Sequence, residues 1–367
     1  MRKQVCGPAK VSRSDSQRVQ DGHYGRSMSR VRTKASLTDV AKAANVSVAT
    51  VSRALWKPNM VSHDLREKVA RICKEMDYIP NRIARSLRKD RTETIGLIVP
   101  TVANPVYAST IAGVRDVLDE IGHGLFISFC ERDPVREYAE VQTLLEHGVD
   151  AILSIMPEHV DELYGLLRRS NVPWAFLSPG GPNQPTPHVN FDNVGAMKSA
   201  VRYVMEKGHR DIAVLSGPHA STPVIGDRLE AVLSELALHR LSPPPEWVVE
   251  CDYEPICARA GARRILEAAQ RPTAVVCTGD QHAVACIAEA GRMGLSLPRD
   301  LSVTGCNDMS IAQLCEPQLT TIRPPYREIG ATACRLVLSA QEGRALPERT
   351  VLEATFIERG SVAAPGR

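Results

Sequence analysis

Leu-Thr-Asp-Val-Ala-Lys-Ala-Ala-Asn-Val-Ser-Val-Ala-Thr-Val-Ser-Arg, residues 37–53, begins as a short amphipathic helix that ends at a tight turn. Val40 and Ala44 lie one helical turn apart and give this helix an apolar face, while Thr38 is a side chain suited to its N-cap. Asn45 stands where the chain must turn, and Asn tolerates the left-handed backbone that such a turn requires. The stretch therefore predicts a short first helix with a sharp stop.

A second and a third helix follow this turn. Ser47 is placed to cap a helix from Val48 to about Leu55, in which Val51 and Leu55 face inward at positions i and i+4. Two short helices joined by a turn of three or four residues form a helix-turn-helix. Ser62 is expected to cap the third helix, whose buried stripe consists of Leu65, Val69, Ile72, Cys73 and Met76.

Charge is distributed unevenly along the chain. The 367 residues carry a net charge of +3, but residues 1–92 hold 21 Lys and Arg against 8 Asp and Glu, which leaves 24 against 34 for residues 93–367. A basic segment joined to an acidic body is typical of a nucleic-acid-binding module with a second domain. Residues 1–34 are basic and lack apolar periodicity, so we expect them to be a disordered extension.

Beyond residue 93, short apolar runs alternate with amphipathic segments. Strands are expected at 95–99, 125–129, 151–155, 174–177, 212–215, 247–250, 274–277 and 302–305, with helices between them. Near-continuous apolar strands separated by helices indicate parallel sheets that are covered on both faces. The Pro- and Gly-rich stretch 178–187 divides these elements into two groups, so the sequence predicts two doubly wound α/β lobes.

The predicted fold class is thus an all-α headpiece followed by two parallel-sheet lobes. We expect the headpiece at 35–80, a linking segment of helical character at 81–93, the α/β body at 94–360 and a tail at 361–367. Within the body, we expect the first lobe at about 94–178 and 308–337, and the second lobe at about 183–306 and 338–360.

Several sequence patterns are missing, and their absence argues against a membrane protein, a metal site and an enzyme. It has no apolar run of 18 residues and no secretory signal pattern, so we expect no membrane partner and a cytoplasmic protein. The ten cysteines include no Cys-x-x-Cys pair, which argues for reduced structural thiols and no metal site. Phosphate-binding glycine loops, a nucleophile elbow and a His/Glu metal motif are also missing, so we expect neither an enzyme nor a cofactor.

The motifs of the chain resemble those of the LacI/GalR family of bacterial transcription regulators. The likeness starts with residues 37–53 and continues through Tyr78-Ile-Pro-Asn81, Ala84-Arg-Ser-Leu87, Ile95-Gly-Leu-Ile-Val-Pro100, Gly208-His-Arg210, Ser302-Val-Thr-Gly305 and Leu319-Thr-Thr-Ile322. It covers essentially residues 36–360. The resemblance implies a repressor that binds a palindromic operator in double-stranded DNA as a homodimer, or as a higher oligomer, under the control of a small effector.

The resemblance also implies which headpiece residues read the DNA sequence. Val48, Ala49 and Arg53 match positions that meet base edges in the major groove. Apolar Val and Ala suit a thymine methyl group, whereas Arg suits guanine O6 and N7. For Val48, packing in the headpiece core is the alternative interpretation.

Further contacts are expected to position the protein on the duplex. Ser47, Thr50, Ser52 and Arg85 are expected phosphate contacts, which set the register without reading sequence. Segment 81–87 resembles the family's hinge helix, and the resemblance makes Leu87 a wedge inserted from the minor groove into a central base step. Ordinary packing of Leu87 under the next domain is the alternative.

The body resembles periplasmic sugar-binding proteins, in which a ligand lies between two lobes. Ligands of open α/β sheets bind beyond the carboxyl ends of the strands. By resemblance, Asn104, Tyr107, Arg228 and Asp280 are the expected effector contacts, and the effector is expected to be a sugar or sugar acid. A surface ion pair is the alternative for Arg228 and Asp280, a turn for Asn104, and a core aromatic for Tyr107.

Two other classes of protein are alternatives to a regulator. A sugar-binding component of a transport system needs a secretory signal and lacks a stretch such as 47–53. An enzyme on a doubly wound fold needs one of the motifs that are missing here. Members of the resembled family either leave DNA when their ligand binds or require it as a corepressor, and the sequence is compatible with both.

Overall fold

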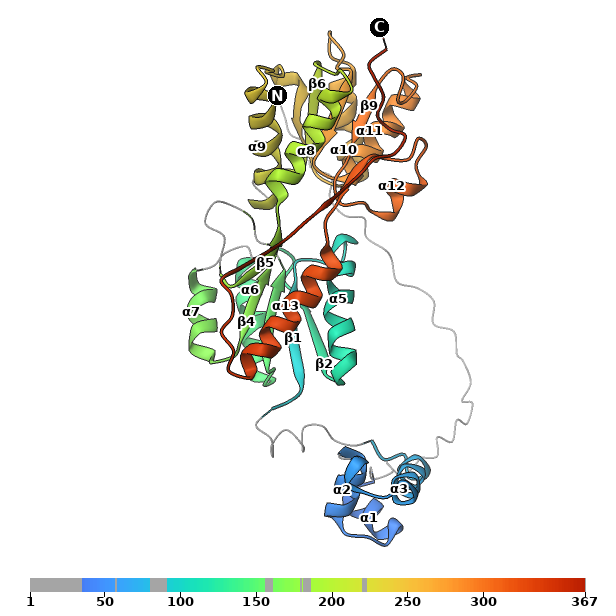
Figure 1. The fold of residues 1–367 in the computed structure, drawn as a ribbon, viewed down its shortest axis with the longest axis vertical. Coiled ribbons are helices and arrows are strands. Elements are labelled where there is room, and N and C mark those ends of the chain that lie inside the picture. Colours follow the sequence, from blue (N-terminus) through green and yellow to red (C-terminus); the bar gives the residue numbers. More distant parts are fainter. Residues whose placement is uncertain are drawn as a thin grey trace, which may run out of the picture. The chain divides into compact units, whose positions relative to one another are not determined.

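The structure is a computed structural model that describes residues 35–56, 58–79, 91–155, 161–178, 180, 186–219 and 223–366. The chain divides into two compact units, residues 1–81 and 82–367. The first unit is helical and the second is an α/β body (Figure 1). The predicted disordered extension, 1–34, lies outside the described residues, and so does the predicted hinge helix, 81–87.

The first unit consists of short helices around a small apolar core. Its elements are α1 (Leu37–Ala44), α2 (Val48–Trp56), the 3-10 turn η1 (Pro58–Met60) and α3 (His63–Glu75). Val40 of α1, Val51 of α2 and Val69 of α3 are buried in one cluster. These elements confirm the predicted helix-turn-helix and its third helix.

Side-chain caps set the ends of these helices. The Ser36 hydroxyl accepts from the Asp39 N–H at 3.3 Å, while the Asp39 carboxylate accepts from the Ser36 N–H at 2.9 Å. The prediction that Thr38 caps α1 is therefore wrong by two residues, because this reciprocal pair satisfies two backbone donors at once. Asn45 has φ 55° and ψ 48°, which confirms the predicted left-handed turn between α1 and α2.

The first lobe of the α/β body contains a six-stranded parallel sheet in the order β11-β5-β4-β3-β1-β2. Side chains alternate between its faces, so that Leu97 packs with α5 and α13 whereas Ile98 packs with α6 and α7. The strands are β1 (Thr94–Val99), β2 (Gly124–Phe129), β3 (Ala151–Ile155), β4 (Trp174–Leu177), β5 (His188–Phe191) and β11 (Arg349–Leu352). The helices are α5 (Val106–Ile121), α6 (Pro134–Glu146), α7 (Asp161–Ser170) and α13 (Tyr326–Gln341).

Helices α5 and α13 approach each other closely at two glycines. A Cβ atom on Gly113 would lie 1.8 Å from the carbonyl oxygen of Arg327, and one on Gly330 would lie 2.1 Å from that of Thr110. No larger residue fits at either position without moving a helix. This contact fixes the start of α13, and with it the side chain of Tyr326.

The second lobe contains a four-stranded parallel sheet in the order β7-β6-β8-β9. Its strands are β6 (Ile212–Ser216), β7 (Val248–Glu250), β8 (Ala274–Cys277) and β9 (Ser302–Thr304). Its helices are α8 (Asn193–Glu206), α9 (Pro223–Leu238), α10 (Pro255–Leu266), α11 (Asp280–Arg292) and α12 (Ser310–Leu314), with the turn η2 (Pro245–Trp247). Both sheets are parallel and covered by helices, which confirms the predicted fold class.

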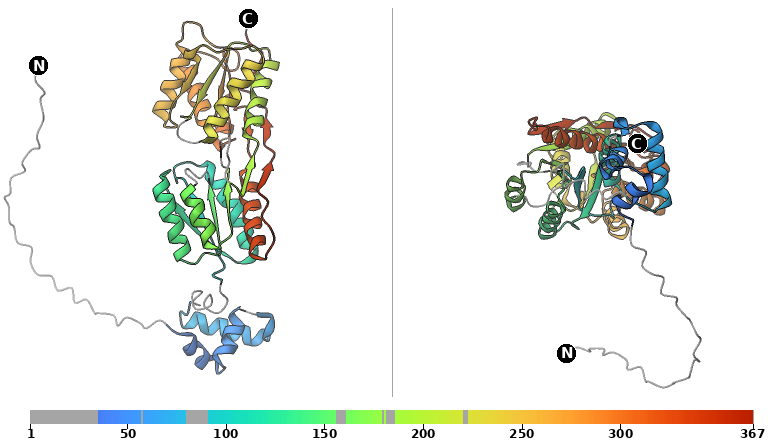
Figure 2. Two further views of the ribbon diagram at one scale, coloured as in Figure 1. Left: turned by 90° about the vertical axis from the view of Figure 1, so that its left-hand side faces the viewer. Right: turned by 90° about the horizontal axis from the view of Figure 1, so that it is seen from below.

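The chain passes between the lobes after β5, after β10 (Thr321–Arg323) and between β11 and β12 (Thr355–Ile357), and β10 pairs antiparallel with β12. These crossover strands run along one side of the lobes (Figure 2). They correct the predicted lobe boundaries. Strands β5 and β11 belong to the first sheet, and α12 belongs to the second lobe, because strand pairing and core packing decide membership.

The predicted tail, 361–367, is also corrected for the part that the structure describes. The Ser361 hydroxyl donates to the Val303 carbonyl at 2.6 Å and accepts from the Thr320 N–H at 2.9 Å. The Ala363 N–H donates to the Ser302 hydroxyl at 3.1 Å. These bonds dock the chain end on the second lobe instead of leaving it in solvent. Of the helices described, none has the length and apolar character to cross a membrane.

Candidate functional site

Helix α2 presents three of the predicted DNA-contact residues on its outer face. Val51 and Ala54 are buried, whereas Val48, Ala49 and Arg53 are exposed. Val48 keeps 39% of its surface, so the alternative that it packs in the core is wrong. The outer face therefore offers two small apolar side chains and one guanidinium, the groups needed for contact with base edges.

The start of α2 is fixed by the residues predicted to touch phosphates. The exposed Ser47 accepts from the Thr50 N–H at 3.1 Å, and the two hydroxyls lie 2.8 Å apart. Ser52 is half-buried, and the Arg53 Nε donates to the Ala49 carbonyl at 3.3 Å. Arg85 and Leu87, the remaining predicted contacts, lie outside the described residues.

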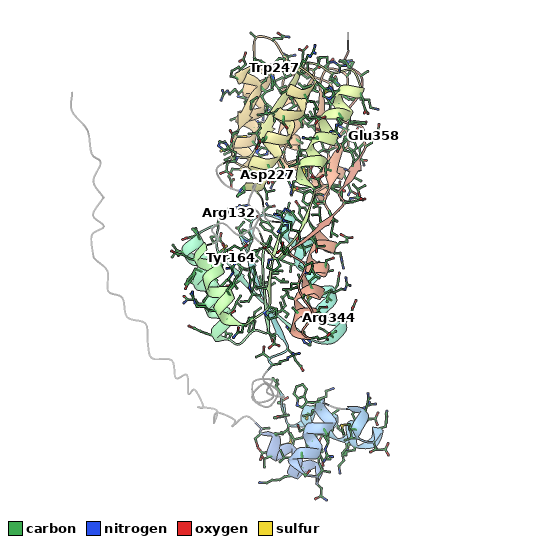
Figure 3. The ribbon with its side chains drawn as sticks, turned by 60° about the vertical axis from the view of Figure 1, so that its left-hand side comes forward. Arg132, Tyr164, Asp227, Trp247, Arg344 and Glu358 are labelled. Atoms are coloured by element: carbon green, nitrogen blue, oxygen red, sulfur yellow. The ribbon has the colours of Figure 1, made fainter. Side chains whose placement is uncertain are left out.

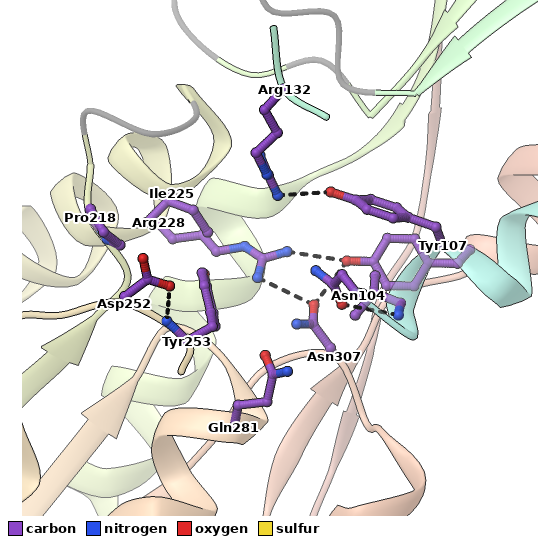
Figure 4. Close-up of a pocket in the computed structure, with 12 residues that line it drawn as sticks. Asn104, Tyr107, Arg132, Pro218, Ile225, Arg228, Asp252, Tyr253, Gln281 and Asn307 are labelled. Carbon is purple, nitrogen blue, oxygen red and sulfur yellow. Dashed lines mark hydrogen bonds between the residues drawn. The ribbon is translucent and has the colours of Figure 1, made fainter. Parts of the chain in front are cut away.

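A second candidate site is a cavity of about 150 Å³ lined by both lobes of the α/β body. Its polar walls follow the carboxyl ends of strands in both sheets, where ligands of such sheets bind. The lining consists of Asn104, Val106, Tyr107, Arg132, Pro218, Ile225, Arg228, Asp252, Tyr253, Gln281, Asn307 and Tyr326 (Figure 4). Among the described residues, no cluster of His, Cys, Asp and Glu is placed to hold a metal ion.

Arg228 of α9 is the central group of this cavity. Its side chain is 2% exposed, and its Nε donates to Asn193 Oδ1 at 2.9 Å. Its Nη1 donates to the Thr278 carbonyl at 3.0 Å and to Asn307 Oδ1 at 3.2 Å, and its Nη2 donates to the Tyr326 hydroxyl at 3.3 Å. The guanidinium is thus held by both lobes, and the alternative of a surface ion pair is wrong.

Tyrosines surround this guanidinium. The Tyr326 hydroxyl donates to Asn307 Oδ1 at 2.8 Å, and burial raises the pKa of Tyr326 to about 12. Burial also raises the pKa of Tyr253 above its usual value. From the first lobe, Arg132 Nη2 donates to the Tyr107 hydroxyl at 3.0 Å. Figure 3 shows Arg132 at the end of the first lobe that faces the second lobe.

Asp280 does not line the cavity, which corrects one predicted effector contact. It is fully buried, and its Oδ1 accepts from the Thr321 hydroxyl at 2.6 Å while its Oδ2 accepts from the Met309 N–H at 2.6 Å. Its neighbour Gln281 faces the cavity instead. Asp280 therefore joins the wall of the cavity to the crossover strand β10.

Asn104, Tyr107 and Arg228 all line this cavity. The alternatives for the first two residues also hold, because Asn104 Oδ1 accepts from the Val106 N–H at 3.1 Å and Tyr107 is buried in the core of the first lobe. Sequence reasoning missed other residues of the cavity. Arg132, Asp252, Tyr253 and Asn307 belong to this group. Each of them comes within a few residues of the end of a strand that the sequence did predict. Their position just after a predicted strand was the sequence feature that could have identified them as cavity residues.

Comparisons with known proteins agree with this geometry. Residues 36–81 match the bacterial regulatory proteins of the lacI family, and residues 201–362 match the periplasmic binding protein-like domain. The repressor CytR of Escherichia coli strain K12 is 30% identical over 333 residues, and the repressor PurR of Erwinia tasmaniensis is 33% identical over 334 residues. Each alignment covers 90% of this chain and 97% of the relative.

Solved structures show the same fold. A Lac repressor dimer bound to operator and the anti-inducer ONPF has a TM-score of 0.80 at 26% identity, covering 90% of this chain and all of that one. A complex of the regulator CelR with cellobiose has a TM-score of 0.67 at 29% identity, covering 89% and 99%. These proteins are transcription regulators rather than enzymes. The chain belongs to the lacI family of bacterial regulatory proteins and is a DNA-binding transcriptional repressor.

Proposed function

We propose that this repressor acts in the cytoplasm as a homodimer on a palindromic operator, and that a sugar or sugar acid bound between its lobes controls it. The observation that carries this proposal is the cavity, which takes polar side chains from both lobes. A ligand that binds there with different affinity in two arrangements of the lobes shifts the equilibrium between them. CytR and PurR are named repressors, and CelR was solved with cellobiose.

We assign base recognition to the outer face of α2. Val48 and Ala49 are exposed apolar groups for thymine methyls, and Arg53 is an exposed guanidinium for guanine. Ser47, Thr50 and Ser52 are the proposed phosphate contacts on the same helix. Arg85 and Leu87 complete the proposal as a phosphate contact and a minor-groove wedge, on sequence resemblance alone.

The proposed dimer surface lies at the exposed edges of the two lobes. The edge strand β2 exposes Phe126 and Ile127, at 48% and 40% of their surface. In the second lobe, α12 exposes Ile311 and Leu314, at 40% and 82%. Both elements lie on the right-hand side in Figure 1. Large exposed apolar side chains on one element of each lobe favour contact with a second copy of the chain.

A band-shift assay combined with a thermal-shift screen tests the proposal. Purified protein should retard palindromic DNA and not a scrambled control, and the retarded species should contain two chains. A ligand at 100 times its dissociation constant should add about 2.7 kcal/mol to the free energy of unfolding. The proposal fails if no sugar, sugar acid or nucleoside changes both thermal stability and operator binding.

A further inference from the structure

The positive charge of Arg228 has no negative partner among the described residues. Every acceptor of its guanidinium is neutral: two amide oxygens, one backbone carbonyl and one tyrosine hydroxyl. A guanidinium has five N–H donors, and these four bonds leave one N–H on Nη2. A buried cation therefore keeps its charge and one donor at the wall of the cavity (Figure 4).

Several other buried charges of the protein are paired with an opposite charge. The carboxylate of Glu235, 1% exposed, accepts from Arg202 at 2.7 Å. The carboxylate of Asp308, 2% exposed, lies 2.6 Å from both Arg323 and Arg359. Because an unpaired buried charge is costly, such pairing is the rule in folded proteins. Arg228 has no such partner among the described residues, and it lines a cavity.

Two acidic side chains in or beside the cavity wall, Asp252 and Asp280, form no ion pair with Arg228 in the described structure. Asp252 lines the cavity, but it is exposed and its Oδ1 accepts from the Tyr253 N–H at 2.6 Å. Asp280 is bonded to Thr321 and Met309, and burial raises its pKa by more than the charge of Arg228 lowers it. Neither carboxylate forms an ion pair with the guanidinium in the described structure.

A second guanidinium faces the same cavity from the first lobe. Arg132 follows β2, is half-buried and donates to Tyr107, while Arg228 comes from α9 of the second lobe. Guanidinium groups bind carboxylate and phosphate oxygens with two parallel bonds, which makes them the preferred partners of such anions. Two arginines from opposite lobes therefore create a site that favours a negative ligand.

We propose that the effector is an anion, a sugar acid whose carboxylate supplies the missing counter-charge of Arg228 and contacts Arg132. This inference rests on the proposed function, because it takes the cavity as the effector site. The ligand's hydroxyl groups then meet Asn104, Gln281 and Asp252. Because the anion would bind Arg132 of the first lobe and Arg228 of the second lobe at once, it also favours the arrangement in which the lobes are close together.

The variant Asn307→Asp tests the missing charge without any ligand. Asn307 Oδ1 already lies 3.2 Å from Arg228 Nη1, so a carboxylate at this position supplies the counter-ion from within the chain. We expect Asn307→Asp to raise the melting temperature above wild type at neutral pH. Asn171→Asp, an exposed position that makes the same charge change, should leave it unaltered. A melting temperature of Asn307→Asp at or below wild type overturns the proposal.

Matched acid and neutral probes test the ligand class. Gluconate and glucuronate are compared with sorbitol and glucose at equal millimolar concentration, and sodium phosphate with sodium chloride at equal ionic strength. We expect wild type and Asn171→Asp to be stabilised by the acids and not by their neutral partners. Asn307→Asp should bind those acids about a hundredfold more weakly, because two negative charges then meet in one site.

The outcomes separate this inference from the proposed function. Stabilisation by sorbitol or glucose equal to that by the acids overturns the anion but keeps the cavity as the effector site. Stabilisation by phosphate alone, lost in Asn307→Asp, keeps the anion and replaces the carboxylate by a phosphate group. Absence of stabilisation of wild type by the sugar acids and by phosphate alike overturns the anion, whatever the operator assay shows.

Discussion

Arg53 and Arg228 are the arginines on which the two proposed activities depend, and the chain surrounds them in different ways. Arg53 is exposed on α2, and within the part of the chain that the structure describes its side chain bonds to a carbonyl one turn earlier in the same helix. Arg228 is buried and is held by residues of α8 and α13 and by the segments that follow β8 and β9. The DNA-contact surface therefore depends on local structure, whereas the cavity depends on the assembly of two lobes.

If this contrast holds, damage to the headpiece core should leave the cavity intact. Val51→Ala removes a fully buried side chain from a small core, so the headpiece should lose about 2–3 kcal/mol of stability and operator affinity should fall with it. The melting transition of the α/β body should stay in place. Calorimetry with operator titration measures both. Val48→Ala on the outer face is the matched control and should change headpiece stability by less than about 0.5 kcal/mol.

The local character of Arg53 predicts a change in specificity without a change in folding. Arg53→Ala should relax the preference at one operator position by about 1–3 kcal/mol, because a two-bond contact to guanine is lost. Titration against operators with single base changes measures this effect. Arg66→Ala, on the exposed side of α3, is the control for loss of positive charge alone. An unchanged base preference in Arg53→Ala would remove Arg53 from the readout.

The same contrast explains what the sequence could and could not reveal. In α2, the inward Val51 and the outward Val48 follow from helical periodicity within one short segment. In the cavity, Asp280 and Gln281 are adjacent at the start of α11, where one residue rotates the side chain by about 100°. The sequence predicted a helix after the strand at 274–277, but not which of these two side chains faces the cavity.

The prediction of which strands belong to which lobe was wrong for a related reason. The sequence predicted a boundary within 178–187, and β5 follows that stretch directly, yet β5 pairs with β4 and β11 of the first lobe. Its partner β11 lies more than 150 residues later in the chain. Apolar periodicity identifies a strand, but long-range pairing decides the sheet to which the strand belongs.

The non-local support of the cavity predicts that a single hydroxyl matters to the α/β body. Tyr326→Phe removes the group that accepts from Arg228 and donates to Asn307, so the body should lose about 1–2 kcal/mol of stability. Denaturant titration measures this loss, and the headpiece transition should not move. Tyr138→Phe is the control, because its hydroxyl has no hydrogen bond in the described structure. Equal effects of the two variants would show that the hydroxyl of Tyr326 contributes nothing specific.

The smallest expected effect is a pH dependence that arises in the cavity wall. Burial raises the pKa of Asp280 from 3.8 to about 6, so the folded state binds its proton more tightly than the unfolded state does. Ionisation of this carboxyl therefore reduces the free energy of unfolding as the pH rises through about 6, and lowering the pH from about 7 to about 5 should restore about 1 kcal/mol.

Asp280→Asn isolates this contribution. Burial lowers the pKa of His209 and of His282, and protonation of these histidines acts in the opposite direction as the pH falls. Because the asparagine amide can still accept from Met309 and donate to Thr321, the variant removes the titration while keeping both bonds. The unfolding free energy of the variant minus that of wild type should therefore decrease by about 1 kcal/mol when the pH falls from 7 to 5, because only wild type gains stability from protonation of Asp280. A difference that is constant over this range would mean that Asp280 ionises normally and that the wall of the cavity is more open to water than its burial indicates.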